Sequence, residues 1–203
     1  MTALALLAGA AAARADGDPY AAMLAPSGTC GAAADQLDLD PAAAEAAMLC
    51  LTNYARAEQG LAPLQANATL DAAGQAKLEA DISCAQFTHT PCGQSFAVVF
   101  APYLTGATSY EIGENIAWGT GDYGTPRQTM NAWLHSDGHR ENILTAAYTE
   151  VGIGYLSGQS FQGETGATLW SQEFGTRSPS MTTTKPAAQK KHKPKPRRPK
   201  RRS

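Results

Sequence analysis

Apolar residues recur at three- and four-residue steps in two early stretches of the chain, and each stretch follows a residue that commonly caps a helix. The first stretch begins at Asp40-Pro41 and stops at Gly60. The second begins at Asn67 and continues through Ala80. A capping side chain accepts hydrogen bonds from the free N–H groups of the first turn, proline suits the first helical position, and glycine suits the end. The pattern therefore predicts two helices.

A different periodicity marks the last third of the chain. Thr125-Pro126 predicts a further helix by the same capping pattern. Apolar residues alternate in Glu150–Leu156, and Ala167–Phe174 has a similar β character, so both are predicted as strands joined by a hairpin loop at Gly158–Gly166. The aromatic and β-branched run Phe96–Leu104 fits a short helix or a buried strand equally. Helices in the first part of the chain, followed by strands near its end, predict a layered α+β domain.

The chain ends in a basic segment that differs from everything before it. Ten Lys and Arg residues, spaced by prolines, lie between Lys185 and Arg202. Before Lys185 there are six Lys and Arg and all 18 Asp and Glu, a net charge of −12, so the overall charge of −2 describes neither part. We predict that residues 177–203 form an extended, disordered tail.

Such a tail would bind polyanions by releasing their counterions, with an affinity that falls steeply as salt rises. For an exported protein the polyanions would be cell-wall teichoic acids or anionic lipid headgroups. The alternative is a tail that only solubilises the protein. No aromatic residue follows Phe174, so the tail offers no ring for base stacking and nucleic acid is not an expected partner.

The first residues are typical of a secretory signal. Ala3–Ala13 is apolar and too short to span a bilayer, and it ends in a small-x-small cleavage pattern before Asp16. The alternative is a disordered Ala-rich start, because Met1-Thr2 lacks the positive charge of a signal. We predict a signal peptide at 1–15, a linker at 16–39, one domain at 40–176, and no transmembrane segment. The mature protein would be secreted, and the tail could hold it at the cell envelope.

Four cysteines agree with export, because disulfides persist outside the cytosol. They are Cys30, Cys50, Cys84 and Cys92, and four cysteines allow three pairings. Cys84 and Cys92 flank a short loop, so Cys84–Cys92 with Cys30–Cys50 is the simplest answer. The alternative is a zinc site of Cys84, His89 and Cys92, which lacks an obvious fourth ligand.

Two histidines and one glutamate are the candidate chemical groups of the domain: His89, Glu114 and His139. Two imidazoles and a carboxylate suit a divalent cation such as Zn²⁺, and they also suit proton transfer near neutral pH. Spacing along the chain does not bring them together. From the residues alone, buried and hydrogen-bonded histidines are the simpler interpretation.

Seven short motifs follow one another between Pro41 and Gly175. They are Asn53-x-x-Arg56 with Gly60-Leu-x-Pro-Leu64, Phe87-Thr-His89, Gly113-Glu-Asn-Ile-Ala117, Trp133-x-x-Ser136, Gly138-His-Arg-x-Asn-Ile143, Val151-Gly-x-Gly154 and Leu169-Trp-Ser-Gln-x-Phe-Gly175. Their order and spacing resemble bacterial members of the CAP superfamily, the cysteine-rich secretory, venom-antigen and pathogenesis-related proteins. The resemblance covers about Pro41–Gly175 and implies a three-layer α-β-α sandwich with a large central cleft.

The resemblance also implies where the cleft residues lie. The family cleft typically presents two histidines and two acids, and His89, Glu114 and His139 match three of them by motif. Ser136 stands where the fourth acid is usual. Glu114 could act as a ligand or as an internal brace between the histidines. Ser136, His139 and Glu114 also have the residue types of a serine-hydrolase triad, although Ser136 lacks the usual nucleophile turn.

Three functions follow as hypotheses. The first is a non-enzymatic binding module, because relatives in the superfamily bind sterols or lipids; its cleft would take an apolar or lipid ligand and could hold a cation on His89, Glu114 and His139. The second is an extracellular hydrolase of peptides or cell-wall polymer, metal-assisted or acid/base. The third is an adhesion or scaffolding protein that the basic tail tethers to the envelope.

Overall fold

The structure, a computed structural model, describes residues 17–179. Among them, no helix is long and apolar enough to cross a membrane. The α-helices are α1 (Pro41–Glu58), α2 (Ala68–Ser83), α3 (Ala101–Leu104), α4 (Pro126–Leu134) and α5 (Asp137–Leu144). The strands are β1 (Gln65–Ala66), β2 (Ala107–Thr120), β3 (Glu150–Phe161) and β4 (Glu164–Pro179). Short 3-10 turns are η1 (Ala21–Met23), η2 (Ala32–Asp35), η3 (Pro91–Gly93), η4 (Phe96–Val98) and η5 (Gly121–Gly124).

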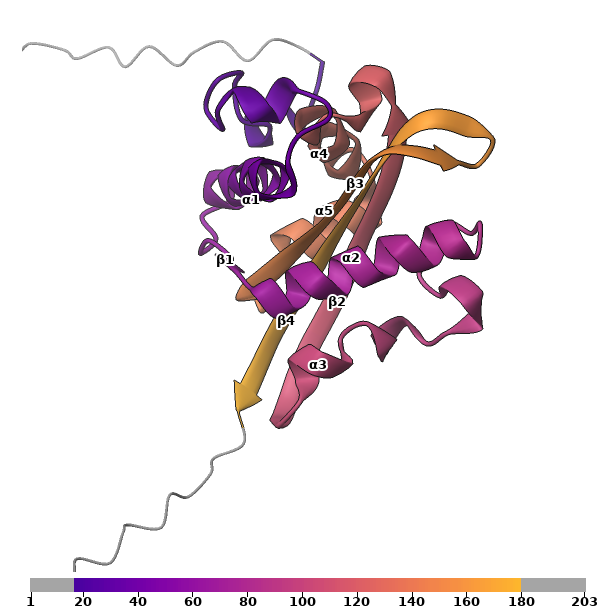
Figure 1. Cartoon of the computed structure of the whole chain (residues 1–203). Helices are drawn as coiled ribbons and strands as arrows, with labels where there is room; N and C mark the ends of the chain where they lie inside the picture. The colour runs from indigo at the N-terminus through magenta and orange to yellow at the C-terminus, as the bar shows by residue number, and fades with distance from the viewer. Residues whose placement is uncertain (1–16, 180–203) are drawn as a thin grey trace, which may run out of the picture.

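One sheet with the strand order β1-β3-β4-β2 forms the centre of the molecule. Strand β4 pairs antiparallel with both β2 and β3, and the short β1 pairs parallel with β3. Strand β2 is therefore an outer strand of the sheet. Figure 1 shows β2 and β4 running side by side along the length of the molecule.

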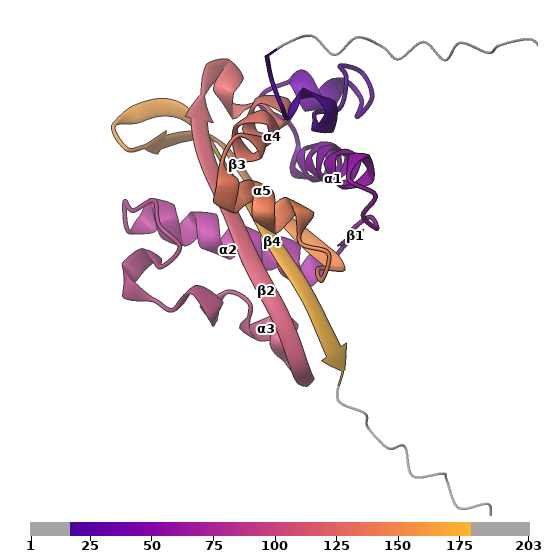
Figure 2. The ribbon, with the colours of Figure 1, turned by 180° about the vertical axis from the view of Figure 1, so that it is seen from behind.

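Helices cover both faces of this sheet (Figures 1 and 2), which confirms the predicted α+β architecture of three layers. Helices α2 and α3 lie on one face, and α1, α4 and α5 on the other. Gly152 and Gly154 of β3 allow α2 to lie against the strand, because a Cβ at either position would overlap backbone atoms of α2. On the opposite face, Val151, Ile153 and Tyr155 join the main apolar core.

The predicted helix starts are confirmed. Asp40, Asn67 and Thr125 each accept a hydrogen bond from a backbone N–H of the first turn of the helix that follows. The ambiguous run 96–104 is helical rather than a strand. The predicted loop at 158–166 is shorter than expected, because β3 continues to Phe161 and β4 begins at Glu164.

Residues 17–39 were expected to be a linker, but the structure packs them onto the domain. Met23, Ala25 and Ala34 are buried in the main core. Arg127 of α4 binds the carboxylate of Asp35 and the carbonyl of Ala25. The buried apolar side chains and the bonds from the buried Arg127 guanidinium together hold this segment against α1 and α4. At the other end, β4 continues to Pro179, past the predicted start of the tail; the rest of the tail and the signal at 1–15 lie outside the described residues.

Both predicted disulfides are confirmed. Cys30 pairs with Cys50 and Cys84 with Cys92, each with Cα atoms 5.6 Å apart. The alternative prediction of a zinc site at Cys84, His89 and Cys92 is therefore wrong, because the sulfur atoms of Cys84 and Cys92 are bonded to each other. The first bridge ties the N-terminal segment to α1, and the second closes the loop that follows α2.

Candidate functional site

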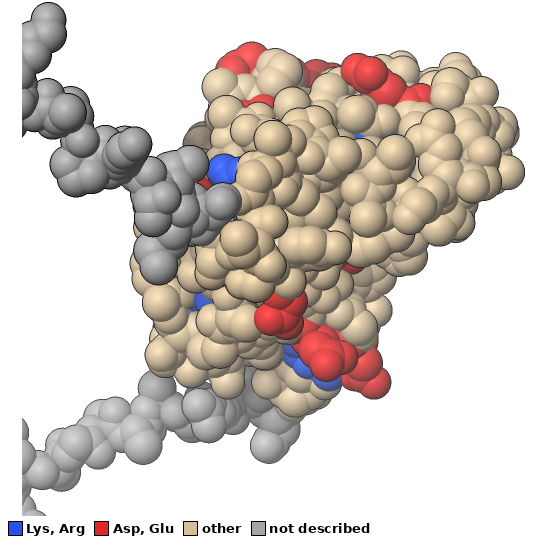
Figure 3. All heavy atoms as spheres, turned by 90° about the horizontal axis from the view of Figure 1, so that it is seen from below, with Lys and Arg blue, Asp and Glu red and all other residues tan. Residues whose placement is uncertain are grey.

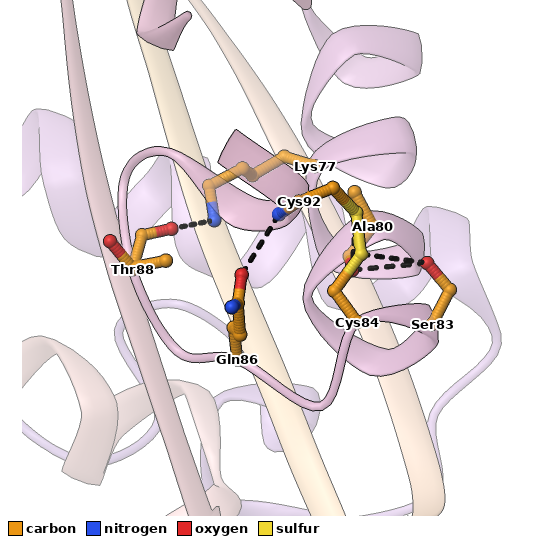
Figure 4. Close-up of a disulfide and its surroundings, with 7 residues drawn as sticks. All are labelled: Lys77, Ala80, Ser83, Cys84, Gln86, Thr88 and Cys92. Atoms are coloured by element: carbon orange, nitrogen blue, oxygen red, sulfur yellow. Dashed lines mark hydrogen bonds between the residues drawn. A yellow bond between two sulfur atoms is a disulfide. The ribbon is translucent and has the colours of Figure 1, made fainter. Parts of the chain in front are cut away.

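The loop that carries His89 is held at several points (Figure 4). The Cys84–Cys92 disulfide closes it against the end of α2. Lys77 of α2 donates from Nζ to the carbonyl of Thr88 at 2.7 Å, and Gln86 accepts from the Cys92 N–H at 2.9 Å. The ring of Phe96 meets His89 edge-on, with ring centroids 6.5 Å apart. A loop without regular secondary structure thus presents its imidazole in a defined position.

His89 and Glu114 form a direct pair. Nδ1 of His89 lies 2.5 Å from Oε1 of Glu114 in β2. The Glu114 side chain is almost fully buried, whereas 53% of the His89 side chain is exposed. The hydrogen bond to Glu114 raises the pKa of His89, and the partial burial of the ring opposes that effect. The site therefore favours a protonated imidazolium that is open to solvent on one side.

A second acid, Glu173 of β4, lies beneath this pair and was not predicted from the sequence. It stands directly opposite Glu114 in the β2–β4 register, so both side chains point to the same face of the sheet. Glu173 is fully buried, and neither of its carboxylate oxygens has a hydrogen-bond partner among the described residues; the same is true of Oε2 of Glu114. Burial raises the pKa of Glu173 well above its ordinary range, and the charge of Glu114 adds to the effect.

Lys77 and Asp81 of α2 form a buried ion pair on the same side of the sheet, with Nζ 2.6 Å from Oδ2. Burial raises the pKa of Asp81, and the hydrogen bond from Lys77 opposes it. The site is therefore a buried group of ionisable side chains below an exposed imidazole. Buried ionisable groups with perturbed pKa values often mark functional sites.

We expect the Glu173→Gln variant to lose less stability than the wild type as the pH rises. The folded state raises the pKa of Glu173 above the unfolded value of about 4.5, so this group's contribution is complete below that pH and is lost as the pH rises through the folded pKa. Glutamine does not titrate. Urea unfolding from about pH 4 to 8 measures the difference between the two slopes. Glu164→Gln, at an exposed carboxylate, is the control. Parallel curves for Glu173→Gln and wild type would show that Glu173 is charged in the folded protein.

His139 lies on the first turns of α5 and contacts Ser136 instead of Glu114. Its Nδ1 is 2.7 Å from Oγ of Ser136. The side-chain amide of Asn115 donates to the His139 carbonyl at 3.0 Å, which joins α5 to β2. Asn142 reinforces this junction by donating to the carbonyl of Glu114 at 3.0 Å. Burial lowers the pKa of His139, and the positive charge of a protonated His89 lowers it further.

The two histidines should therefore titrate in separate pH ranges. We expect His89 to lose its proton above the ordinary value of 6.5 and His139 below it, because a carboxylate stabilises the first imidazolium and burial disfavours the second. Ring-proton NMR across the neutral range measures both. Glu114→Gln should move the His89 midpoint down, since it removes the largest cause of the shift. A His89 midpoint at or below that of His139 would contradict the observed pairing.

The structure thus forms two pairs from the four predicted residues. His89 contacts Glu114, and His139 contacts Ser136. Ser136 and His139 meet the contact that a nucleophile and its base require, but the nearby acid Glu114 hydrogen-bonds to the other histidine.

The same arrangement bears on the predicted metal set of His89, Glu114 and His139. Within residues 17–179, no three His, Cys, Asp or Glu side chains are grouped so that they could hold a metal ion. The Nδ1 atom of His89 is already committed to Glu114. These residues therefore do not fit a three-ligand zinc site as they stand.

Comparison with known proteins identifies a family that contains this domain. A model of the cysteine-rich secretory protein family, CAP, matches residues 49–174. An uncharacterized protein of Bacillus subtilis, YkwD, is 35% identical over 125 residues, which cover 61% of this chain and 44% of that protein. The chain thus spans less than half of that relative.

Solved structures show the same fold at low sequence identity. An outer surface protein from Borrelia burgdorferi has a TM-score of 0.53 and 19% identity, over 64% of this chain and 90% of that one. An extracellular protein with an SCP domain from Bacillus anthracis has a TM-score of 0.50 and 19% identity, over 68% of this chain and 44% of that one.

Proposed function

The chain belongs to the CAP family of cysteine-rich secretory proteins, and from that premise we propose that it is a secreted binding module for an amphipathic, lipid-like ligand. Two proteins with a similar fold are an outer surface protein and an extracellular protein. The two disulfides agree with an oxidising compartment. The proposed division is a signal at 1–15 and a polyanion-binding tail after the last strand.

The observation that carries the proposal is an apolar groove between α2 and the segment 94–102. Its volume is about 450 Å³, within the usual range of small-ligand pockets. Alanines of α2 form one wall, and Val98, Val99 and Pro102 form the other. Val98 is 47% exposed although it is apolar, so the groove offers surface that a ligand would remove from water. The lining residues are Thr69, Ala72, Ala73, Ala76, Ala80, Gln94, Val98, Val99 and Pro102.

The His89 site adjoins this groove through Phe96. The ring of Phe96 contacts His89, and Val98, two residues later, lines the groove. A raised pKa favours a positive charge on His89 at neutral pH. We therefore propose that the acyl part of the ligand lies along α2 and that its polar or anionic end lies toward His89.

Mass spectrometry of organic extracts from the purified protein tests whether a lipid occupies the groove. The proposal predicts that a lipid copurifies with the wild type and is depleted in Ala76→Phe, whose added ring would fill the groove. Ala57→Phe adds the same ring at an exposed position of α1 and should retain the lipid. Equal lipid content in both variants would contradict the proposed location.

A hydrolase is the second candidate, and the Ser136–His139 contact of 2.7 Å is the observation that favours it. In this alternative His139 would take the proton of the Ser136 hydroxyl, and the imidazolium of His89 would stabilise a developing negative charge. Peptide or wall-polymer hydrolysis that disappears in Ser136→Ala would support it. Unchanged hydrolysis in that variant would remove Ser136 from the chemistry. Metal analysis of wild type and His89→Ala tests the metal-assisted form.

Envelope tethering by the tail is the third candidate, and the charge of the domain favours it. Residues 17–179 carry 17 Asp and Glu but five Lys and Arg, each of which is buried, ion-paired or stacked on an aromatic ring. Figure 3 shows acidic groups at the edge and near the centre of one face, with fewer basic atoms visible among them. The tail is therefore the chain's main source of free positive charge. Deleting Lys185–Ser203 should abolish salt-sensitive retention on isolated cell walls; unchanged retention would refute tethering.

A further inference from the structure

A second pocket lies at the Thr120 end of β2, opposite the end that pairs with Pro179, and shares no lining residue with the α2 groove. Its volume is about 430 Å³. Trp118, Tyr123 and Glu164 contribute two aromatic rings and a carboxylate, and no Lys or Arg lines it. The remaining lining residues are Ala117, Gly119, Thr120, Gln128, Thr129 and Ala132.

The two aromatic side chains are held in different ways. Trp118 and Phe161 form a T-shaped pair with ring centroids 5.7 Å apart, so Trp118 packs against a small apolar cluster. Tyr123 is 78% exposed, the largest exposed fraction among the large apolar side chains of residues 17–179. An aromatic ring that is exposed to water makes few apolar contacts in the free protein. A ligand that covers the ring would supply those contacts, so the ring is suited to a binding surface.

The backbone beneath Tyr123 is fixed although its ring is free. Gly119 has no Cβ, and a Cβ there would lie 2.8 Å from the Tyr123 carbonyl oxygen, so η5 can pack directly on β2. The indole N–H of Trp170 donates to the Gly124 carbonyl at 2.9 Å. The contacts therefore fix the backbone of the turn that carries Tyr123, which lines the same pocket as Trp118, and the ligand would not have to order the loop.

The negative charge around the pocket indicates that its ligand is a cation. The described domain has a strong excess of acids, and its cations are engaged elsewhere; Arg127, on the neighbouring helix α4, binds Asp35. A negative surface concentrates cations, and aromatic faces attract an ammonium group most strongly when it is weakly hydrated. We propose that this pocket binds a small organic cation with a quaternary ammonium group, which would lie against Trp118 and Tyr123 with Glu164 as its counter-ion.

Titration of the full-length protein with choline tests this proposal. The indole signal of Trp118 and the amide signals of Gly119, Thr120 and Tyr123 should move saturably in NMR spectra. The probe 3,3-dimethylbutanol has the same shape without the charge and should bind at least about fivefold more weakly, as a cation–π contribution of about 1 kcal/mol implies. No saturable shift with choline, or equal affinity for the neutral probe, would overturn the proposal.

Two variants locate the site without disturbing the core. Tyr123→Leu and Glu164→Gln change exposed side chains and should each weaken choline binding about three- to tenfold. Asp122→Asn removes a nearby carboxylate that does not line the pocket, and Tyr110→Leu removes an exposed tyrosine near the other end of β2. Both controls should bind choline like the wild type. Wild-type affinity in Tyr123→Leu and Glu164→Gln would also overturn the proposal.

The source of the ammonium group is decided by a third comparison. Retention on phosphatidylcholine vesicles that is lost in Tyr123→Leu would identify a lipid headgroup. Choline binding without such retention would identify a free cation. Either result supports an ammonium site, and both differ from the outcome for the α2 groove, which Ala76→Phe would alter without affecting choline.

Discussion

Gly152→Ala is expected to destabilise the protein by about 3 kcal/mol or more. The added Cβ would overlap the backbone of Leu70 and Asp71 at the start of α2. Backbone atoms of a helix cannot move aside like the end of a flexible side chain, so α2 would have to shift from the sheet as a unit. That shift would also carry Lys77 and the His89 loop away from Glu114.

Urea or thermal unfolding measures the effect, and Gly138→Ala is the matched control. Gly138 lies in α5, and nothing is within 4 Å of a Cβ built on it. Alanine there should be neutral or slightly stabilising, because it favours helix. Similar stability for the two alanine variants would show that α2 does not lie as close to β3 as described.

Arg56→Lys should destabilise the protein by about 3–5 kcal/mol although it keeps the positive charge. The guanidinium is buried and donates to the carbonyls of Ala62, Ile143 and Thr145 at 2.8–2.9 Å, with Tyr148 at 3.5 Å. A lysine ammonium cannot reach acceptors in these directions together, so buried carbonyls would lose their partners. The contacts to Ile143, Thr145 and Tyr148 join α1 to the end of α5 and to the loop before β3, and their loss should loosen α5.

The control is Arg140→Lys, at a cation that binds the exposed carboxylate of Asp137 and lies over the ring of Tyr20. Arg140 also donates to one carbonyl, that of Leu134 at 2.7 Å, whereas Arg56 donates to several. A pair with an exposed carboxylate contributes little, so the effect of Arg140→Lys should be about 1 kcal/mol, clearly smaller than that of Arg56→Lys. Both variants are measured by urea unfolding at the same pH. An Arg56→Lys effect as small as that of Arg140→Lys would mean that water replaces the lost donors.

The helix starts were predictable because their signals are local. A capping side chain and a proline specify the beginning of α1 and α4 within a few residues. Strand β2 was not predicted, because Glu114 interrupts its inward face between Ile112 and Ile116 and so breaks the alternation that marks a strand. The disulfide pairing followed from the short loop between Cys84 and Cys92.

The candidate site was predicted in part, and the missing part depends on tertiary pairing. The motif resemblance named His89, Glu114 and His139, but it placed Ser136 where a second acid is usual. Glu173 is 59 residues from Glu114, and only the β2–β4 register puts the two carboxyls side by side. The sequence signal that existed was an acid next to Phe174 in a segment with β character, at a position where a buried charge is costly.

Titration of the full-length protein with palmitate tests the proposed binding function most directly. We expect saturable binding to the wild type and to Ala57→Phe, and at least about tenfold weaker binding to Ala76→Phe, the loss of roughly 1.4 kcal/mol that a blocked groove would cause at minimum. Unfolding curves of the three proteins should coincide, because both alanines are exposed. Absence of saturable binding to the wild type, or equal binding to Ala76→Phe, would contradict the assignment of the α2 groove as the ligand site.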